Sequence, residues 1–309
     1  MPSTGALVNA NAGRARRDPA LGGRLRTMLG DERVRLTRKA EDVGPALDAL
    51  REAGVERLML VGGDGTVGGT LTELLDRWPE SSLPSVLVTA GGTVNTIAKS
   101  LGCGGPPEAV LARILERGPR ELSPRPLVAI STPDGVRRSG MIFANGVAVR
   151  WLRMYYEDSS RGFAGASSVV ARILGSALVR GALARKVFAP AAARVEVDGA
   201  LLALERFTVM AASSCVHIGL GFAPFHLAGR DPHRFHFAVT EANAARIAAE
   251  LPALRLGVKQ PGSCIQDHAA SRVVLRFPEP QPWSIDADLY PPAEELALEA
   301  TAPVRFLLP

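Results

Sequence analysis

The sequence predicts two domains, a doubly wound parallel α/β domain followed by a C-terminal antiparallel β-sandwich. Three observations support this fold class. Apolar runs alternate with helical patterns up to about residue 125, short β-like runs separated by turn residues follow, and 309 residues are too many for one compact core. We place the α/β domain at 1–125, with a return segment at about 292–309, and the sandwich at 126–291.

Composition narrows the class of partner. The chain is 47% hydrophobic and 22% charged, which is typical of an ordered globular protein, and its net charge of +5 suits anionic partners such as nucleotide phosphates or acidic lipid headgroups. The arginines are scattered rather than interleaved with aromatic residues, which argues against nucleic acid. Three cysteines without a CxxC pair and the lack of a signal-peptide pattern predict a cytoplasmic protein, and no apolar run reaches the ~20 residues of a membrane span.

The first domain is predicted from strands that alternate with helices. Strands are expected at 6–9, 33–37, 58–61 and 86–88, and helices at about 19–29, 41–54, 67–77 and 107–117. In such a sheet, ligands bind at the carboxyl ends of the strands.

The most informative segment is Gly62-Gly63-Asp64-Gly65-Thr66, which follows a buried strand and precedes a helical pattern. Glycines on a strand-to-helix turn let the backbone approach a ligand closely, and the helix N-terminus favours phosphate. The acid in this loop, Asp64, suggests a metal-linked or catalytic role. The alternative is an ordinary tight turn between a strand and a helix.

Two further polar turns end strands of the same predicted sheet. They are Asn9-Ala10-Asn11-Ala12-Gly13 and Gly91-Gly92-Thr93-Val94-Asn95. Because the carboxyl ends of parallel strands share one edge, we expect all three turns to lie together.

The second domain is read from β-like runs at 127–131, 139–149, 194–198, 206–212, 234–239 and 272–277. A helical insert at about 163–188 carries arginines, including Arg172 and Arg180; it is either packed on the sandwich or a basic amphipathic element that meets an anionic membrane. Residues 219–225 are apolar and glycine-rich, and they line either an apolar cleft or the core. Four histidines, at 217, 226, 233 and 236, lack the spacing of a zinc site, and Cys215 lacks an orienting acid for nucleophilic catalysis.

These motifs resemble the diacylglycerol kinase catalytic-domain family, which includes sphingosine and ceramide kinases and bacterial lipid kinases. The resemblance implies ATP-dependent transfer of a phosphoryl group to a lipid hydroxyl, with Mg²⁺. It also implies roles for individual residues of this chain. Nucleotide binding falls to Asn9, Asn11, Gly13, Thr37, Gly62, Gly63, Asp64, Gly65, Thr66, Gly92, Thr93 and Asn95. Asp64 would also hold Mg²⁺, and Asp288, in Ile285-Asp286-Ala287-Asp288, would be the general base, with Asp286 as the competing candidate.

The chain departs from the family pattern at several positions. Ala10 replaces a proline, Thr96 stands where an acid often follows Asn95, Ala287 replaces a glycine, and Asp288 replaces a glutamate. The structural metal site of the second domain is reduced to Asp231, in the segment 229–233.

We therefore expect a cytoplasmic lipid kinase that is peripheral to the inner face of the membrane, and its lipid and its oligomeric state, a homodimer included, stay open. Two other functions remain at this point. One is an NAD kinase, a related enzyme class that also carries GGDGT; the other is a catalytically inactive regulator that binds nucleotide or lipid.

Overall fold

The fold is described from a computed structural model over residues 2–92, 95–121, 124–157, 168–169, 171–173, 175–176, 181–218 and 221–308. The chain divides into two compact units, residues 1–125 with 302–309, and residues 126–301. None of the described helices has both the length and the apolar character that crossing a membrane requires.

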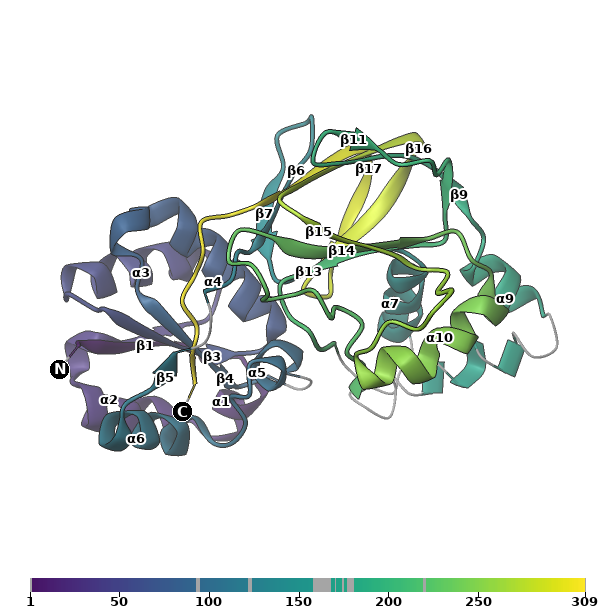
Figure 1. The fold of residues 1–309 in the computed structure, drawn as a ribbon. Helices are drawn as coiled ribbons and strands as arrows, with labels where there is room; N and C mark the ends of the chain where they lie inside the picture. Colours follow the sequence, from purple (N-terminus) through teal and green to yellow (C-terminus); the bar gives the residue numbers. More distant parts are fainter. Residues whose placement is uncertain are drawn as a thin grey trace. The chain divides into compact units, whose positions relative to one another are not determined.

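A four-stranded parallel sheet forms the centre of the N-terminal unit, in the order β2-β1-β3-β4. Helices cover both of its faces, with α3 and α4 on one and α2 and α6 on the other (Figure 1). The strands are β1 (Thr4–Asn9), β2 (Val34–Thr37), β3 (Arg57–Gly62) and β4 (Ser85–Ala90). The helices are α1 (Gly13–Arg17), α2 (Leu21–Leu29), α3 (Val43–Glu52), α4 (Asp64–Arg77), α5 (Thr96–Ser100) and α6 (Pro107–Arg117).

Burial on both faces explains the apolar strands of this sheet. Leu7, Leu58 and Leu60 have no exposed surface, and Val88 has 1%. A parallel sheet with helices on both sides buries every side chain of its central strands, so its strands read as continuous apolar runs. The predicted doubly wound parallel domain is thereby confirmed.

The C-terminal unit contains ten strands in one antiparallel sheet, whose main path runs β15-β14-β13-β8-β16-β17-β6-β7, with β10 and β11 joined to β16. The sheet strands are β6 (Val128–Ser131), β7 (Arg137–Gly140), β8 (Ile142–Gly146), β10 (Arg194–Val197), β11 (Ala200–Leu201), β13 (Val209–Ser213), β14 (Phe235–Thr240), β15 (Gln266–Ala270), β16 (Arg272–Ile285) and β17 (Asp288–Ala300). A separate two-stranded pair is formed by β9 (Ala191–Ala192) and β12 (Arg206–Phe207).

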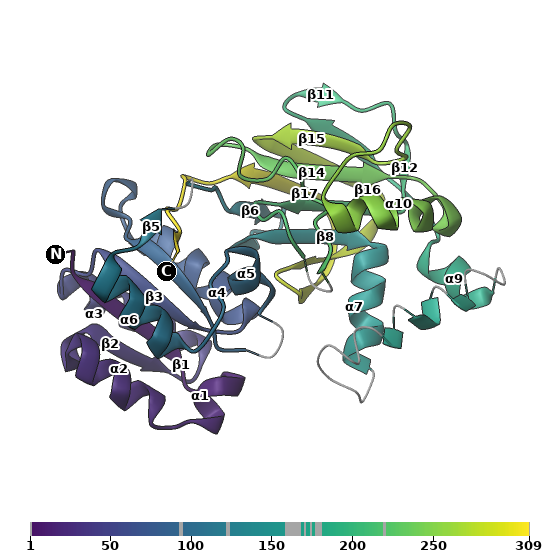
Figure 2. The same ribbon diagram turned by 60° about the horizontal axis from the view of Figure 1, so that its bottom comes forward.

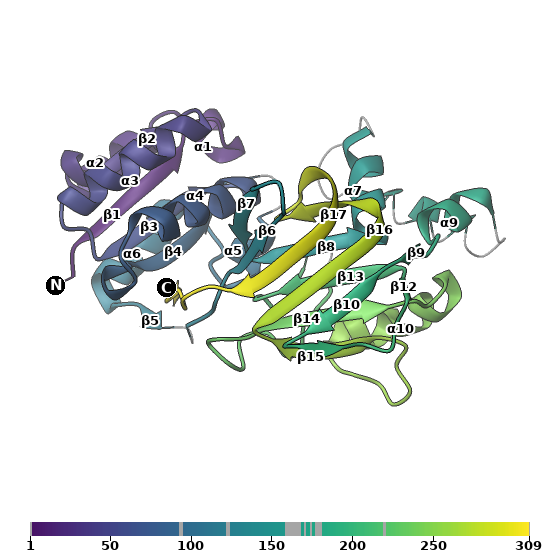
Figure 3. The same cartoon turned by 90° about the horizontal axis from the view of Figure 1, so that it is seen from above.

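One core lies between the two layers of this sheet. It combines side chains from β13 and β14, such as Met210 and Phe237, with side chains from β10, β16 and β17, such as Val195, Trp283 and Leu298. Figure 3 shows β16 running past both β17 and β10. The long strand β16 is bonded to β8 at one end and to β10 at the other, so the two layers belong to one continuous sheet.

Two helices of the C-terminal unit were not expected from the sequence. Residues 139–149 read as one strand, but β8 ends at Gly146, whose φ of +71° breaks the strand, and α7 (Val147–Glu157) begins at the next residue. The second is α10 (Ala244–Leu256), which starts at Asn243, whose side chain accepts a hydrogen bond from the backbone N–H of Arg246. Pro252 inside α10 hides its helical pattern.

The return segment is shorter than the predicted 292–309. Residues up to 300 belong to β17, which pairs with β16 and β6, so the chain rejoins the N-terminal unit only from Ala302. There β18 (Leu307–Leu308) pairs with β5 (Arg120–Glu121). Of the expected helix at 163–188, the structure describes 168–169, 171–173 and 175–176 in part and then α9 (Ala182–Val187); Arg180 lies outside the described residues.

Candidate functional site

The carboxyl ends of the parallel strands meet at one rim of the N-terminal sheet. Asn9 is in register with Thr37, and Gly62 with Ala90, so the segments 9–13 and 62–66 and the turn after β4 all leave from this edge (Figure 2). The strands β1 and β3 are neighbours, and the chain leaves them toward β2 and β4, on opposite sides. Such a switch point is where open α/β sheets bind their ligands.

Two of the glycine turns touch backbone to backbone. The N–H of Gly91 donates a hydrogen bond to the carbonyl oxygen of Gly62 over 3.0 Å. A Cβ atom on Gly91 would lie 2.6 Å from the nitrogen of Gly62, and one on Gly92 would lie 2.4 Å from the Cα of Gly63. No side chain fits in this contact, so these glycines are required for the two loops to meet.

The first loop is tied to the second through a side-chain pair. The amide Nδ2 of Asn9 donates to the hydroxyl oxygen of Thr66 over 2.8 Å, and the Oδ1 of Asn9 accepts from the backbone N–H of Asn11 over 2.9 Å. The side chain of Asn11 in turn donates to the carbonyl of Arg38 over 2.8 Å. The Asn9 side chain therefore fixes both the turn after β1 and the Thr66 hydroxyl.

Asp64 joins the second loop to the third. It is the first residue of α4, and its Oδ2 and Oδ1 accept hydrogen bonds from the backbone N–H groups of Thr96 and Ile97 over 3.0 and 2.9 Å. The carboxylate thus caps the start of α5, 32 residues further along the chain. A carboxylate oxygen has two lone pairs, so both oxygens keep the capacity to accept a further contact.

The third loop is closed by Asn95. This residue has a left-handed backbone with φ of 54°, and its amide accepts from the N–H of Gly92 over 2.6 Å and donates to the Gly92 carbonyl over 2.8 Å. Asparagine tolerates this conformation because its short side chain bonds to the local backbone. Thr93, predicted as a nucleotide contact, lies outside the described residues.

The remaining predicted nucleotide residues take different positions. Gly13 starts α1, and Gly65 lies in the first turn of α4. Thr37 is 2% exposed, with its hydroxyl 3.5 Å from the Val8 carbonyl and its own carbonyl accepting from Ala10 over 2.9 Å. In this structure Thr37 supports the loop from inside the sheet.

Basic residues that the sequence reading did not single out belong to this rim. The short helix α1 carries Arg14, Arg16 and Arg17, and Arg38 and Lys39 follow β2. The side chains of Arg16, Arg17, Arg38 and Lys39 are exposed. Positive charge beside loops rich in backbone N–H groups favours an anionic ligand.

In the C-terminal unit, the candidate base lies at the end of the β16–β17 hairpin. Asp286 and Ala287 form its two-residue turn with φ of 48° and 73°, and Asp288 begins β17. Asp288 is an exposed residue. Partial burial of its carboxyl group nevertheless raises the pKa of this group above the ordinary 3.8. A raised pKa makes a carboxylate a better proton acceptor.

Asp286 has a structural role in the same hairpin. It is 6% exposed, and its Oδ1 accepts from the backbone N–H groups of Met141 and Ile142 over 3.0 and 2.9 Å. A Cβ atom on Gly140 would lie 2.4 Å from its Oδ2, so the neighbouring strand must present a glycine there. The Asp286 carboxylate holds the turn that carries Asp288. Tyr156 of α7, which the sequence reading missed, donates to the Ala287 carbonyl over 2.8 Å.

The described part of the chain offers one His/Asp cluster of metal-binding composition, His226, His236 and Asp267. The backbone N–H of Leu227 donates to Nδ1 of His236 over 3.2 Å, so the ring proton lies on Nε2, which donates to Asp267 over 2.8 Å. Lys259 places its ammonium nitrogen 2.7 Å from the other oxygen of Asp267. His236 has no lone pair left for a metal, and the cation beside Asp267 is Lys259.

The metal implied at Asp231 does not fit the residues present either. One oxygen of Asp231 accepts from the backbone N–H of His233 over 2.8 Å, and the other faces Nε of Arg234 at 3.8 Å. A guanidinium group therefore stands beside this carboxylate, where a divalent cation would be repelled.

Comparisons with known proteins agree with this geometry. The family described as "Diacylglycerol kinase catalytic domain" matches residues 4–124. Two solved structures of Bacillus anthracis str. Sterne, a diacylglycerol kinase and a putative diacylglycerol kinase, are 12% and 13% identical, with TM-scores of 0.65 and 0.66. Each alignment covers 99% of this chain and 97% of that chain.

Two other comparisons carry no weight. A yeast NADH kinase complexed with NADH is 8% identical over 100% of this chain and 84% of that chain, and its TM-score of 0.47 is too low for an argument. A search of curated proteins found no match. The family match over residues 4–124 and the shared fold confirm the resemblance predicted from the motifs: this part of the chain is similar to the diacylglycerol kinase catalytic domain.

Proposed function

We propose that this protein is an ATP-dependent lipid kinase, which transfers the terminal phosphoryl group of ATP to the hydroxyl group of a lipid alcohol. The observation that carries the proposal is the joined rim of the N-terminal unit. Asp64, Asn9 and paired glycines hold three strand-end loops together, and all three loops carry residues of the nucleotide-binding motif.

Phosphoryl transfer asks little covalent chemistry of the protein. Catalysis consists of placing the two reactants and neutralising the charge on the transferring group. Glycine loops suit this task because their N–H groups reach phosphate oxygens without steric hindrance. Arginines of α1 add positive charge at the same rim.

Mg²⁺ would supply further charge neutralisation on the phosphates. Hard cations prefer oxygen ligands, and Asp64 is the carboxylate among the described residues of the three loops. Its two oxygens are oriented by the N–H groups of Thr96 and Ile97 and retain free lone pairs. We therefore assign Asp64 as the residue that would hold the ion, directly or through water.

Asp288 is proposed as the base that accepts the proton of the lipid hydroxyl. Its carboxylate is held at the start of β17 by the hairpin that Asp286 anchors. Aspartate is one methylene shorter than the glutamate of the family pattern, so the proton transfer is expected to be direct at closer range or through one water.

A panel of lipids incubated with labelled ATP and resolved by chromatography tests the proposal. Diacylglycerol, ceramide and sphingoid bases are the first acceptors to try, since each presents a hydroxyl group on an apolar body. Phosphorylation of NAD⁺ with no lipid product would instead favour an NAD kinase. Tight ATP binding with no labelled product would favour an inactive regulator.

A lipid substrate also leads us to propose peripheral binding to an anionic membrane, at its inner face. The net charge of +5 favours such a surface. Vesicle sedimentation tests it: the wild type should pellet with anionic vesicles, and charge reversal at Arg172 and Arg180 should weaken this. Equal sedimentation with neutral and anionic vesicles would contradict an electrostatic attraction.

A further inference from the structure

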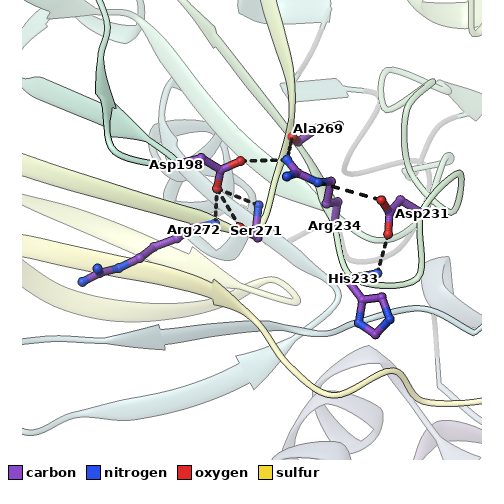
Figure 4. A network of polar contacts seen from close by, with 7 residues as sticks. All are labelled: Asp198, Asp231, His233, Arg234, Ala269, Ser271 and Arg272. Atoms are coloured by element: carbon purple, nitrogen blue, oxygen red, sulfur yellow. Dashed lines mark hydrogen bonds and ion pairs between the residues drawn. The ribbon is translucent and has the colours of Figure 1, made fainter.

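Asp198 is the centre of a polar network in the C-terminal unit. It lies at the turn between β10 and β11, and its Oδ1 accepts hydrogen bonds from the backbone N–H and the hydroxyl of Ser271 and from the backbone N–H of Arg272, over 3.0, 2.8 and 2.8 Å (Figure 4). These donors come from the turn between β15 and β16. One carboxylate oxygen thus holds the connection between the two layers of the sheet.

Arg234 neutralises the other side of this carboxylate. Its Nη1 donates to Oδ2 of Asp198 over 2.8 Å and to the carbonyl oxygen of Ala269 over 2.7 Å, and its Nε lies 3.8 Å from Asp231 (Figure 4). The guanidinium therefore contacts two carboxylates and one carbonyl from three separate segments. Oxygen atoms of this kind are the ligands that a structural Ca²⁺ or Mg²⁺ would gather.

The electrostatics agree with a fixed cation at this position. Partial burial acts to raise the pKa of Asp198, but hydrogen bonds from Arg272, Ser271 and Arg234 outweigh it and hold the pKa below the ordinary value. The carboxylate is thus kept ionised, as a partner for a positive charge.

A similar arrangement is found on β15, the strand that pairs with β14. Asp267 of β15 is 7% exposed at its side chain, and Lys259 supplies its cation over 2.7 Å. Asp198 and Asp267 are therefore each neutralised by a basic side chain of the protein itself.

We propose that Arg234 is a built-in cation that takes the structural place of a divalent metal, so that the C-terminal unit folds without a metal ion. The inference does not depend on the kinase activity, because it concerns only the contacts of Asp198, Asp231 and Ala269. It also explains how the segment 229–233 departs from the family pattern without the fold being lost.

Thermal unfolding without nucleotide tests the proposal. For the wild type, excess EDTA and excess Ca²⁺ or Mg²⁺ should leave the Tm unchanged, and elemental analysis of the purified protein should find no bound divalent metal. A Tm that falls in EDTA, with the fall abolished by Asp231→Asn, would overturn the proposal.

Substitution of the arginine gives the second arm. Arg234→Ala should lower the Tm by roughly 2–6 °C, and Ca²⁺ should restore part of this loss because Asp198, Asp231 and the Ala269 carbonyl are left without a cation. The double variant Asp198→Asn with Arg234→Ala should not respond to Ca²⁺. If Arg234→Ala fails to respond as well, the guanidinium is not standing in the place of a cation.

Arg230→Ala is the matched control, since Arg230 lies in the same loop and donates to the His226 carbonyl over 3.0 Å, without a carboxylate contact among the residues that the structure describes. It should change the Tm less than Arg234→Ala and show no response to Ca²⁺; an equal loss would overturn the proposal. Should Arg234→Ala not fold, Arg234→Lys serves instead. It keeps the charge and should give a folded protein that is indifferent to Ca²⁺, and a rise in its Tm with Ca²⁺ would overturn the proposal.

Discussion

The Asn9 side chain donates a hydrogen bond to the Thr66 hydroxyl over 2.8 Å and thereby joins the loop after β1 to the loop after β3. These residues lie 57 positions apart in the chain. Because the pair orients a hydroxyl group at the predicted nucleotide site, both members should matter for ATP binding.

Thr66→Val removes the hydroxyl at nearly constant shape. We expect it to weaken ATP binding by about 5- to 10-fold, equivalent to one hydrogen bond of ~1 kcal/mol. Asn9→Ala should have a similar effect, and the double variant should lose little more than either alone, because the two side chains act as a unit. Calorimetric titration with ATP and Mg²⁺ measures this. Thr72→Val, whose hydroxyl bonds to the Gly68 carbonyl within α4, should bind normally.

Asp64→Asn should separate the second and third loops of the rim. An amide offers one acceptor oxygen where the carboxylate offers two, so one of the N–H groups of Thr96 and Ile97 loses its partner. We expect phosphoryl transfer to fall by more than about 10²-fold while the protein stays folded, and Asp64→Ala to abolish it. Hydrogen exchange at residues 96 and 97 should quicken in Asp64→Asn. Asp76→Asn, at an exposed position of α4, is the control and should leave this exchange unchanged. If residues 96 and 97 exchange as slowly in Asp64→Asn as in the wild type, Asp64 does not cap α5.

Asp288→Asn should abolish lipid phosphorylation, since a general base typically contributes about 10²–10⁴-fold. A base must be deprotonated to act, and partial burial raises the pKa of Asp288 above 3.8. Activity should therefore fall, as the pH is lowered, at a pH above 3.8. A profile of kcat/KM against pH measures this limb. Full activity of Asp288→Asn would show that another group takes the proton.

Ala287→Gly should stabilise the C-terminal unit. Ala287 has φ of 73°, a left-handed conformation that costs an L-residue roughly 1–2 kcal/mol and that glycine adopts freely. Glycine also adds freedom to the unfolded chain, so we expect a net gain of about 0.5–1 kcal/mol. The turn Asp198-Gly199 is the matched case, with φ of 48° and 85°. Gly199→Ala should lower the free energy of unfolding by a similar amount, since a Cβ atom at this position meets no neighbour and only the backbone conformation disfavours alanine.

Asn145→Leu should also raise stability. Asn145 of β8 has no exposed surface, and neither the nitrogen nor the oxygen of its side-chain amide has a hydrogen-bond partner among the described residues. It lies in register with Met210 and Trp283, two members of the apolar core. A buried amide without partners costs about 1–3 kcal/mol, which a leucine of similar shape would recover. Denaturant unfolding measures the change, and a loss of stability would show that the amide is bonded in solution.

The alternation of elements and the three glycine turns were predictable because their causes are local. A strand buried on both faces must be apolar along its length, and a turn at which two backbones touch must be glycine, so Gly62, Gly63, Gly91 and Gly92 were visible in the sequence. The helices α7 and α10 were missed because Gly146 and Pro252 obscure their patterns. Periodicity also cannot tell where β17 ends and the return segment begins.

The sequence by itself determined the fold class and the loops that form the rim, since spacing and residue type suffice for both. Only the tertiary structure decided what the charged residues do. Asp64 caps α5, and Asp286 holds the β16–β17 hairpin by accepting hydrogen bonds from the backbone at the start of β8. Arg234 takes the place of a divalent metal ion between segments far apart in the chain. A carboxylate acquires its role from the donors that surround it, and folding brings those donors together from positions that no local pattern connects.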